Sequence, residues 1–232
     1  MSGREDLLAR LAGAIAETPV GHPLSARLCH ACRNLAGADS AAITLDYLSA
    51  NRVTLCATDE TASRLEDLQD VVGEGPGRTA AETGRVEVCP LPWPGRERWA
   101  MFAEAAEKVV DQTVIHAVPI QPGDSVLGVL TLYLLRPAPA ELLLDERTLL
   151  TMAAATGAAL ARDPGVFQDD LLSGPWSSRA RIHQATGMVI AQLGLNSDDA
   201  LAVLRAHAYA GETTLTDIAE EVVSRRLRFT NP

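Results

Sequence analysis

Arg181-Ile-His-Gln-Ala-Thr-Gly-Met-Val-Ile190, Asp198-Asp-Ala-Leu-Ala-Val-Leu-Arg-Ala-His-Ala208 and Leu215-Thr-Asp-Ile-Ala-Glu-Glu-Val-Val223 are the three segments that decide the fold of the C-terminal part. In each segment apolar residues recur every three or four positions, which is typical of an amphipathic helix. The predicted inward stripes are Ile182, Ala185, Val189 and Leu193, then Ala200, Val203, Leu204 and Ala208, then Leu215, Ile218, Ala219, Val222, Val223 and Leu227. We therefore expect a small three-helix bundle.

Capping signals bound these three helices. Polar residues that can cap a helix N-terminus precede each stripe, and glycines follow the first two. The expected N-caps are Ser177 or Ser178, Asn196 or Ser197, and Thr214 in a Thr214-x-x-Asp217 capping box, and the expected stops are Gly194 and Gly211. The turns between the helices should therefore be short.

On the N-terminal side of these segments, stretches with a helical period alternate with stretches that have the two-residue period of strands. The predicted helices run through Leu7–Ile15, from about Pro23 to Ala36, through Leu65–Val72, from Arg98 to Val110 and from Asp145 to Arg162. The predicted strands are Ala42–Leu48, Arg52–Thr58, Val86–Cys89, Val114–Ile120 and Val126–Leu135, with Ser49-Ala-Asn51 as a hairpin-length turn. This order predicts a mixed α+β domain with one antiparallel sheet and flanking helices.

The sequence between the two parts has no regular apolar period. Pro164-Gly165 and Ser173-Gly-Pro175 interrupt any periodic pattern, so we expect a linker over residues 163–176. The domains are then 1–162, with the α+β sheet, and 177–232, with the helical bundle. A chain of 232 residues is long enough for both.

Charge is distributed unevenly between the two parts. The chain has 20 basic and 30 acidic residues and a net charge of −10, yet residues 173–232 hold six of each sign. The whole negative excess therefore lies in the first 172 residues. The neutral C-terminal part carries clustered arginines, which can contact phosphates.

Location and redox state are bounded by what the sequence lacks. No apolar run approaches the roughly 20 residues of a membrane-spanning helix, and the N-terminus does not read as a signal peptide. We expect a cytoplasmic protein without a membrane partner. Its four cysteines, Cys29, Cys32, Cys56 and Cys89, are then expected to be reduced.

The C-terminal segments quoted above resemble the ANTAR family of RNA-binding antitermination modules, across nearly all of residues 178–228. The resemblance implies a transcription regulator that binds hairpins in nascent RNA. The family often has Ala-Lys-Gly where this chain has Ala185-Thr186-Gly187, so one cation is missing. The candidate RNA-binding residues are Arg179, Arg181, Thr186, Arg205, Tyr209, Arg225, Arg226 and Arg228.

The N-terminal part resembles GAF domains over roughly residues 20–162, on Leu68-Gln69 followed by Gly73-Glu-Gly-Pro76. GAF domains are implied to bind small molecules or to mediate dimerisation. We therefore expect a sensor domain with a possible small-molecule ligand and a homodimer. The resemblance does not identify cofactor-binding residues, and we expect no cofactor.

Several motifs have a structural reading beside a functional one. Cys29-His-Ala-Cys32 has metal-like spacing but falls in a predicted helix, so buried thiols without a metal are expected. Gly73-Glu-Gly-Pro-Gly77 superficially resembles a phosphate loop but follows a helix, so it is interpreted as a helix C-cap and turn. His183 lies in a predicted helix, as a phosphate-accepting histidine would, but no ATP-binding domain accompanies it, so we do not expect that role. No catalytic constellation is present, and we expect no enzyme.

The arginines also have two readings. Arg225, Arg226 and Arg228 lie where cations compensate a helix dipole, and Arg205 is expected near the bundle surface, as an RNA contact, a solvated residue or an ion-pair partner. Two other functions stay open: a DNA-binding regulator, since Leu215–Val222 is similar to the first helix of a helix-turn-helix, and a purely ligand-binding or dimerising module.

Overall fold

The computed structural model describes residues 2–19, 21–45, 52–92, 98–136, 141–167 and 175–230. Within these ranges the chain forms two compact units. The first comprises residues 1–66 and 74–168, and the second comprises residues 67–73 and 169–232. The expected turn at 49–51 lies outside the described residues.

The first unit is built on one antiparallel sheet. Its strands are β1 (Ser40–Leu45), β2 (Val53–Ala57), β3 (Glu87–Leu91), β4 (Thr113–Ile120) and β5 (Gly128–Leu134), in the order β2-β1-β5-β4-β3. A shift in register between Ile43 and Thr44 interrupts the pairing of β1 with β2. The predicted α+β class with an antiparallel sheet is confirmed.

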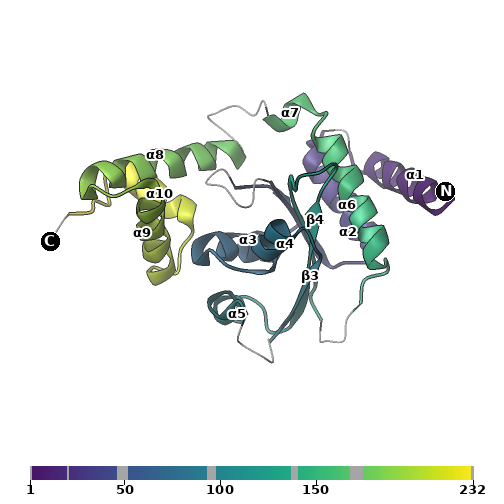
Figure 1. Cartoon of the computed structure of the whole chain (residues 1–232), viewed down its shortest axis with the longest axis horizontal. Helices are drawn as coiled ribbons and strands as arrows, with labels where there is room; N and C mark the ends of the chain where they lie inside the picture. Colours follow the sequence, from purple (N-terminus) through teal and green to yellow (C-terminus); the bar gives the residue numbers. More distant parts are fainter. Residues whose placement is uncertain are drawn as a thin grey trace. The chain divides into compact units, whose positions relative to one another are not determined.

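Helices cover both faces of this sheet. Figure 1 shows α2 (Leu24–Ala36) and α6 (Glu146–Leu160) on one side and α4 (Pro76–Thr83) on the other, with α1 (Ser2–Glu17) outside α2 and α6. Because both faces are covered, every residue of β1 and β5 is buried, instead of every second one as in a half-exposed strand. The remaining helices of this unit are α5 (Ala100–Ala106) and α7 (Pro164–Phe167), and α3 (Glu60–Val72) begins in it.

Close packing in the sheet requires a glycine at one point. A Cβ on Gly128, the first residue of β5, would stand 2.3 Å from the backbone oxygen of Thr44. Gly128 is the pairing partner of Leu45 at the end of β1. Any side chain there would push the two central strands apart.

The second unit is the predicted bundle. It consists of α8 (Pro175–Leu193), α9 (Ser197–Ala210) and α10 (Leu215–Val223). All three predicted stripes are inside, and the fully or nearly fully buried members are Ile182, Ala185, Val189, Ala200, Leu204, Ala208, Leu215, Ile218, Ala219 and Val222. Leu193, Val203, Val223 and Leu227 pack against them half-buried.

Most of the predicted helix caps of the bundle are present in the structure. The Asn196 side chain accepts a hydrogen bond from the Asp199 amide, and the Thr214 hydroxyl accepts one from the Asp217 amide. Gly194, with φ of +70°, follows α8. The prediction of Ser177 or Ser178 as a cap was wrong, because α8 begins at Pro175, and proline is well suited to the first turn of a helix.

Two boundaries differ from the expected ones. Helix α8 begins inside the stretch expected to be linker, of which residues 168–174 lie outside the described ranges. The end of α3 also belongs to the second unit, where Val71 joins the buried cluster of the bundle. The second unit is thus assembled from two separate segments of the chain.

Candidate nucleic-acid interface

Three of the candidate arginines form ion pairs inside the second unit. Arg205 Nη2 lies 3.2 Å from Asp70 Oδ1, and Arg179 Nη1 lies 3.5 Å from Asp70 Oδ2. Arg181 pairs with Glu220 of α10. Each guanidinium therefore faces a carboxylate of the same unit.

Asp70 lies between two of these arginines, Arg179 and Arg205. Its side chain is 11% exposed, against 5% for Arg179 and 26% for Arg205. Of the possibilities stated for Arg205, the structure shows the ion pair. The sequence left this pairing unspecified, because Asp70 comes from the α3 segment, which the sequence did not place in the bundle.

The other three arginines are in a different situation. Arg225, Arg226 and Arg228 are exposed, and within residues 175–230 and the other described ranges no carboxylate lies within ion-pair distance of them. Helix α10 ends at Val223, so they lie just beyond its C-terminus. They form the cationic segment of this unit that is available to an external partner.

The chain after α10 is held in a defined conformation. Arg225 has φ of +62°, a left-handed conformation that a non-glycine residue adopts at a cost of about 1 kcal/mol. The amides of Arg226 and Leu227 both donate to the Glu221 carbonyl oxygen. Farther on, the Phe229 amide donates to Gln192 Oε1 of α8 at 2.8 Å, and the Phe229 ring meets His207 edge-on at 5.3 Å. We call residues 224–230 the tail.

An open hollow of about 620 Å³ lies between α8 and the tail. Met188, Ala191 and Gln192 line it from α8, and Arg225, Arg228 and Phe229 line it from the tail. Arg226 is not among the lining residues. The hollow therefore combines apolar surface, one aromatic ring, one amide and two guanidinium groups.

Thr186 and Tyr209 complete the candidate set. The Thr186 hydroxyl donates to the Ile182 carbonyl oxygen at 2.8 Å, and the residue is 7% exposed. Tyr209, near the end of α9, is 37% exposed. Of these two, only Tyr209 presents substantial surface to a partner.

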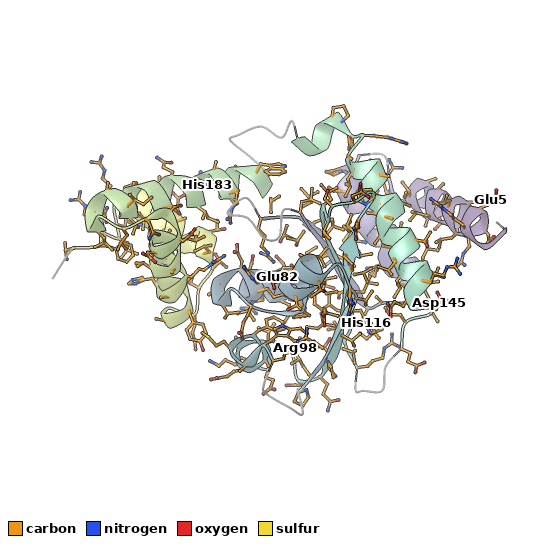
Figure 2. The ribbon with its side chains drawn as sticks, in the orientation of Figure 1. Glu5, Glu82, Arg98, His116, Asp145 and His183 are labelled. Atoms are coloured by element: carbon orange, nitrogen blue, oxygen red, sulfur yellow. The ribbon has the colours of Figure 1, made fainter. Side chains whose placement is uncertain are left out.

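His183 lies on α8 and is labelled in Figure 2. It is an exposed residue. Partial burial of its ring and the nearby charge of Arg179 lower its pKa. At neutral pH the imidazole is therefore predominantly neutral and adds little positive charge to the unit.

The interior of the first unit holds a polar cluster that the sequence analysis missed. Glu66 of α3 is fully buried, and its carboxylate accepts hydrogen bonds from Arg52 Nη2 at 2.8 Å, Thr44 Oγ1 at 3.0 Å and the Tyr133 hydroxyl at 2.9 Å. The side chain of Arg52 is 6% exposed. The carboxylate oxygens thus have hydrogen-bond partners on the sheet, so the cluster is a buried polar centre between α3 and the sheet.

The cysteines of the first unit lie in its core. Cys29, Cys32 and Cys89 are buried, and all four are free thiols. Burial raises the pKa of Cys32 and that of Cys89 to about 12. The Cys29 pKa is also raised, by a hydrogen bond with Cys56 and by burial. No group of three or more metal-ligating side chains occurs among the described residues.

The glycine motif begins a helix as well as ending one. Gly73, with φ of +71°, follows α3, and Gly75, with φ of 143°, caps α4, which starts at Pro76. Between them Glu74 Oε1 accepts hydrogen bonds from the amides of Met101 and Phe102 at the start of α5. Helix α4 was not predicted, and the motif serves to connect helices.

Two family models match the chain, one in each of its two parts. A GAF domain model matches residues 22–160, and an ANTAR domain model matches residues 175–223. No curated protein matches the sequence. None of the described helices has the length and apolar character that crossing a bilayer requires.

Similar solved structures include the following three. The GAF domain of A. aeolicus nlh2 in an inactive state has 12% identity and a TM-score of 0.38, over 66% of this chain and 90% of that one. The chromophore-binding domain of a Stigmatella aurantiaca bacteriophytochrome has 10% identity and a TM-score of 0.42, over 69% and 60%. The photosensory core of a Stigmatella aurantiaca phytochrome has 12% identity and a TM-score of 0.42, over 89% and 44%. This chain thus spans less than two thirds of either phytochrome chain, and no ligand follows from similarity at this level.

Proposed function

Because the chain belongs to the GAF domain family and also carries an ANTAR domain, we propose that it is a transcription antitermination regulator whose second unit binds hairpins in nascent RNA. Both domains are regulatory. In this proposal the GAF unit controls the binding, and a bound hairpin prevents a terminator from forming. The protein acts in the cytoplasm and catalyses no reaction.

One observation carries the RNA assignment. Arg225, Arg226 and Arg228 follow the ANTAR match directly, are exposed, and have no acidic partner in the described part of the chain. Three uncompensated guanidinium groups on seven residues attract phosphates by charge, and they do so although the whole chain has a net charge of −10. Compensation of the helix dipole does not require Arg228, which lies five residues beyond the end of α10.

The geometry favours single-stranded nucleotides over duplex DNA. A helix-turn-helix would need a recognition helix after α10, but residues 224–230 form a turn and an extended tail. Guanidinium planes and exposed rings such as Tyr209 suit unstacked loop bases. We therefore propose RNA hairpin loops as the partner instead of a DNA groove.

Two further parts of the proposal concern the first unit. Its GAF fold supports a response to a small molecule, and the buried Glu66 cluster places a charged group inside it. We also propose a homodimer, because two copies would engage two hairpins of one transcript and gain affinity without new contacts.

A competition experiment tests the function. The full chain is incubated with a labelled pool of RNA hairpins that share one stem and have randomised loops, and with duplex DNA of the stem sequence. We expect a retarded complex with RNA that unlabelled DNA does not displace. Equal displacement by DNA, or no complex with any hairpin, would contradict the proposal.

A further inference from the structure

We propose that the hollow between α8 and the tail is a binding site for one unstacked nucleobase and its flanking phosphates. The inference rests on the proposed function and adds to it the place and the chemistry of recognition. The occupant is a nucleotide of a single-stranded loop.

The walls suit a flat ring. Met188 and Ala191 of α8 and Phe229 of the tail give apolar surface, and Phe229 is half-buried, with its ring T-shaped against the ring of His207. A ring that is already immobilised loses little conformational entropy when a base stacks on it. The hollow, at about 620 Å³, falls in the range of small-molecule sites and is larger than a single base requires.

The charge suits a phosphodiester. Arg225 and Arg228 line the hollow, and no acidic residue does. This contrasts with Arg179, Arg181 and Arg205, which face carboxylates of their own unit. An aromatic floor with two unneutralised guanidinium groups fits a base with a phosphate on each side better than it fits an apolar or acidic peptide side chain.

The backbone conformation of the tail holds it beside α8. Arg225 lies in the left-handed region, and this turn brings the tail back along α8. The contact of the Phe229 amide with Gln192 Oε1 holds the tail there. Strained positions of this kind persist where the surroundings fix them and are frequent at binding sites.

Gln192 supplies a group that can read a base edge. Its Oε1 accepts from Phe229, which orients the amide, and no described residue accepts a hydrogen bond from its Nε2. The Nε2 amine is therefore available to donate to a carbonyl oxygen or a ring nitrogen of a base. An oriented amide beside a stacking surface distinguishes bases by their edges, as in other single-strand sites.

The test uses the full chain and a tight-binding hairpin selected from the randomised-loop pool. Three variants change the hollow: Phe229→Leu keeps an apolar side chain without a stacking face, Arg228→Lys keeps the charge without the planar group, and Gln192→Ala removes the amide. Arg226→Ala is the control, since Arg226 lies on the same tail outside the hollow. Circular dichroism melting establishes that each variant is folded.

We expect Phe229→Leu to weaken binding by about 5- to 100-fold, the range for loss of one stacked base. Replacing one particular loop nucleotide by an abasic residue should weaken wild-type binding equally, and the two changes together should cost no more than either alone. Arg228→Lys should weaken binding of intact and abasic hairpins equally, because the guanidinium is proposed to hold a flanking phosphate, which the abasic residue keeps. Arg226→Ala should lower affinity equally for intact and abasic hairpins.

Three results separate the possible failures. Variants of the hollow that bind like the wild type overturn the inference and leave the proposed function intact. A loss for Phe229→Leu that is equal for intact and for every abasic hairpin shows that no loop base stacks on this ring, and it also overturns the inference. If no hairpin binds the wild type, the proposed function fails first.

Discussion

Substitution of Asp70 by asparagine is expected to destabilise the second unit strongly. Asp70 lies within ion-pair distance of both Arg179 and Arg205, and two of these three side chains are at most 11% exposed. Asparagine preserves the shape but removes the charge. The substitution therefore removes the negative charge that faces the buried Arg179 guanidinium.

The magnitude follows from the burial. Removing one partner of a buried ion pair costs about 3–5 kcal/mol, because the remaining charge stays desolvated. Arg205 is 26% exposed and can recover part of its hydration, so we expect the low end, about 3 kcal/mol. For a unit of this size 1 kcal/mol corresponds to roughly 4–8 °C in melting temperature. The loss should therefore lower the melting temperature of the second unit by more than 10 °C.

The assay is thermal and urea unfolding of the full chain, followed by circular dichroism and calorimetry. Glu221→Gln is the control, since Glu221 is an exposed carboxylate of α10 without a described side-chain partner. We expect a separate early transition for Asp70→Asn and none for the control. A change within about 0.5 kcal/mol for Asp70→Asn, as for an ordinary surface substitution, would refute the reasoning that α3 stabilises the bundle.

Three further predictions follow from the contacts described. Tyr133→Phe removes a hydrogen bond to the buried Glu66 carboxylate and should lower the free energy of unfolding of the first unit by about 1.5–3 kcal/mol in urea titration, while an unchanged value would show that the cluster is not a stabilising centre. The Thr214 and Thr213 hydroxyls lower the pKa of Asp217. The ionised carboxylate therefore stabilises the second unit above the unfolded pKa of about 4, and this contribution is lost as the pH falls through the lowered pKa. Asp217→Asn should thus flatten the acid side of the plot of unfolding free energy against pH, and a wild-type plot would contradict this. Because burial raises the pKa of Cys32 and Cys89 to about 12, alkylation of these thiols by iodoacetamide at pH 8 should require unfolding, and rapid labelling in the folded protein would contradict this. The double variant Cys29→Ser, Cys32→Ser should have the same metal content as the wild type, and zinc that is lost in this variant would contradict the structural role of the two thiols.

The parts of the fold that could be predicted are those with a regular pattern. The stripes of α8, α9 and α10 are read directly, because burial of one face recurs with the helical period. Helix α4 was missed because it has eight residues and starts at Pro76 inside a glycine cluster, which reads as a loop. A proline at the first helical position after a glycine cap was the available signal.

The polar contacts could not be predicted, because they join positions far apart in the sequence. Glu66 meets Tyr133 across 67 positions, and Asp70 meets Arg205 across 135. One signal was present in α3: Ala62, Glu66 and Asp70 lie four residues apart and so share a face, which is buried. Two acids on the buried face of a helix need cationic partners elsewhere, and this requirement would have directed attention to Arg52 and Arg205.

The candidate arginines show the same limit. The sequence grouped Arg179, Arg181 and Arg205 with the C-terminal three, because all six occur in a neutral segment. Only the structure separates those that face carboxylates from Arg225, Arg226 and Arg228, which do not among the described residues. Clustering in the sequence identified the segment, and the positions of the carboxylates determine which members are available.

The salt dependence of RNA affinity tests the central claim most directly. The association constant of the full chain for the selected hairpin is measured by fluorescence anisotropy at several salt concentrations, for the wild type and for a variant with Arg225, Arg226 and Arg228 all replaced by alanine. Each lost phosphate contact reduces the slope of log K against log salt by about 0.7–0.9, so we predict that loss of the three arginines lowers the slope by about 2 to 3 units and weakens binding. Equal affinity and an equal slope for the two proteins would contradict it.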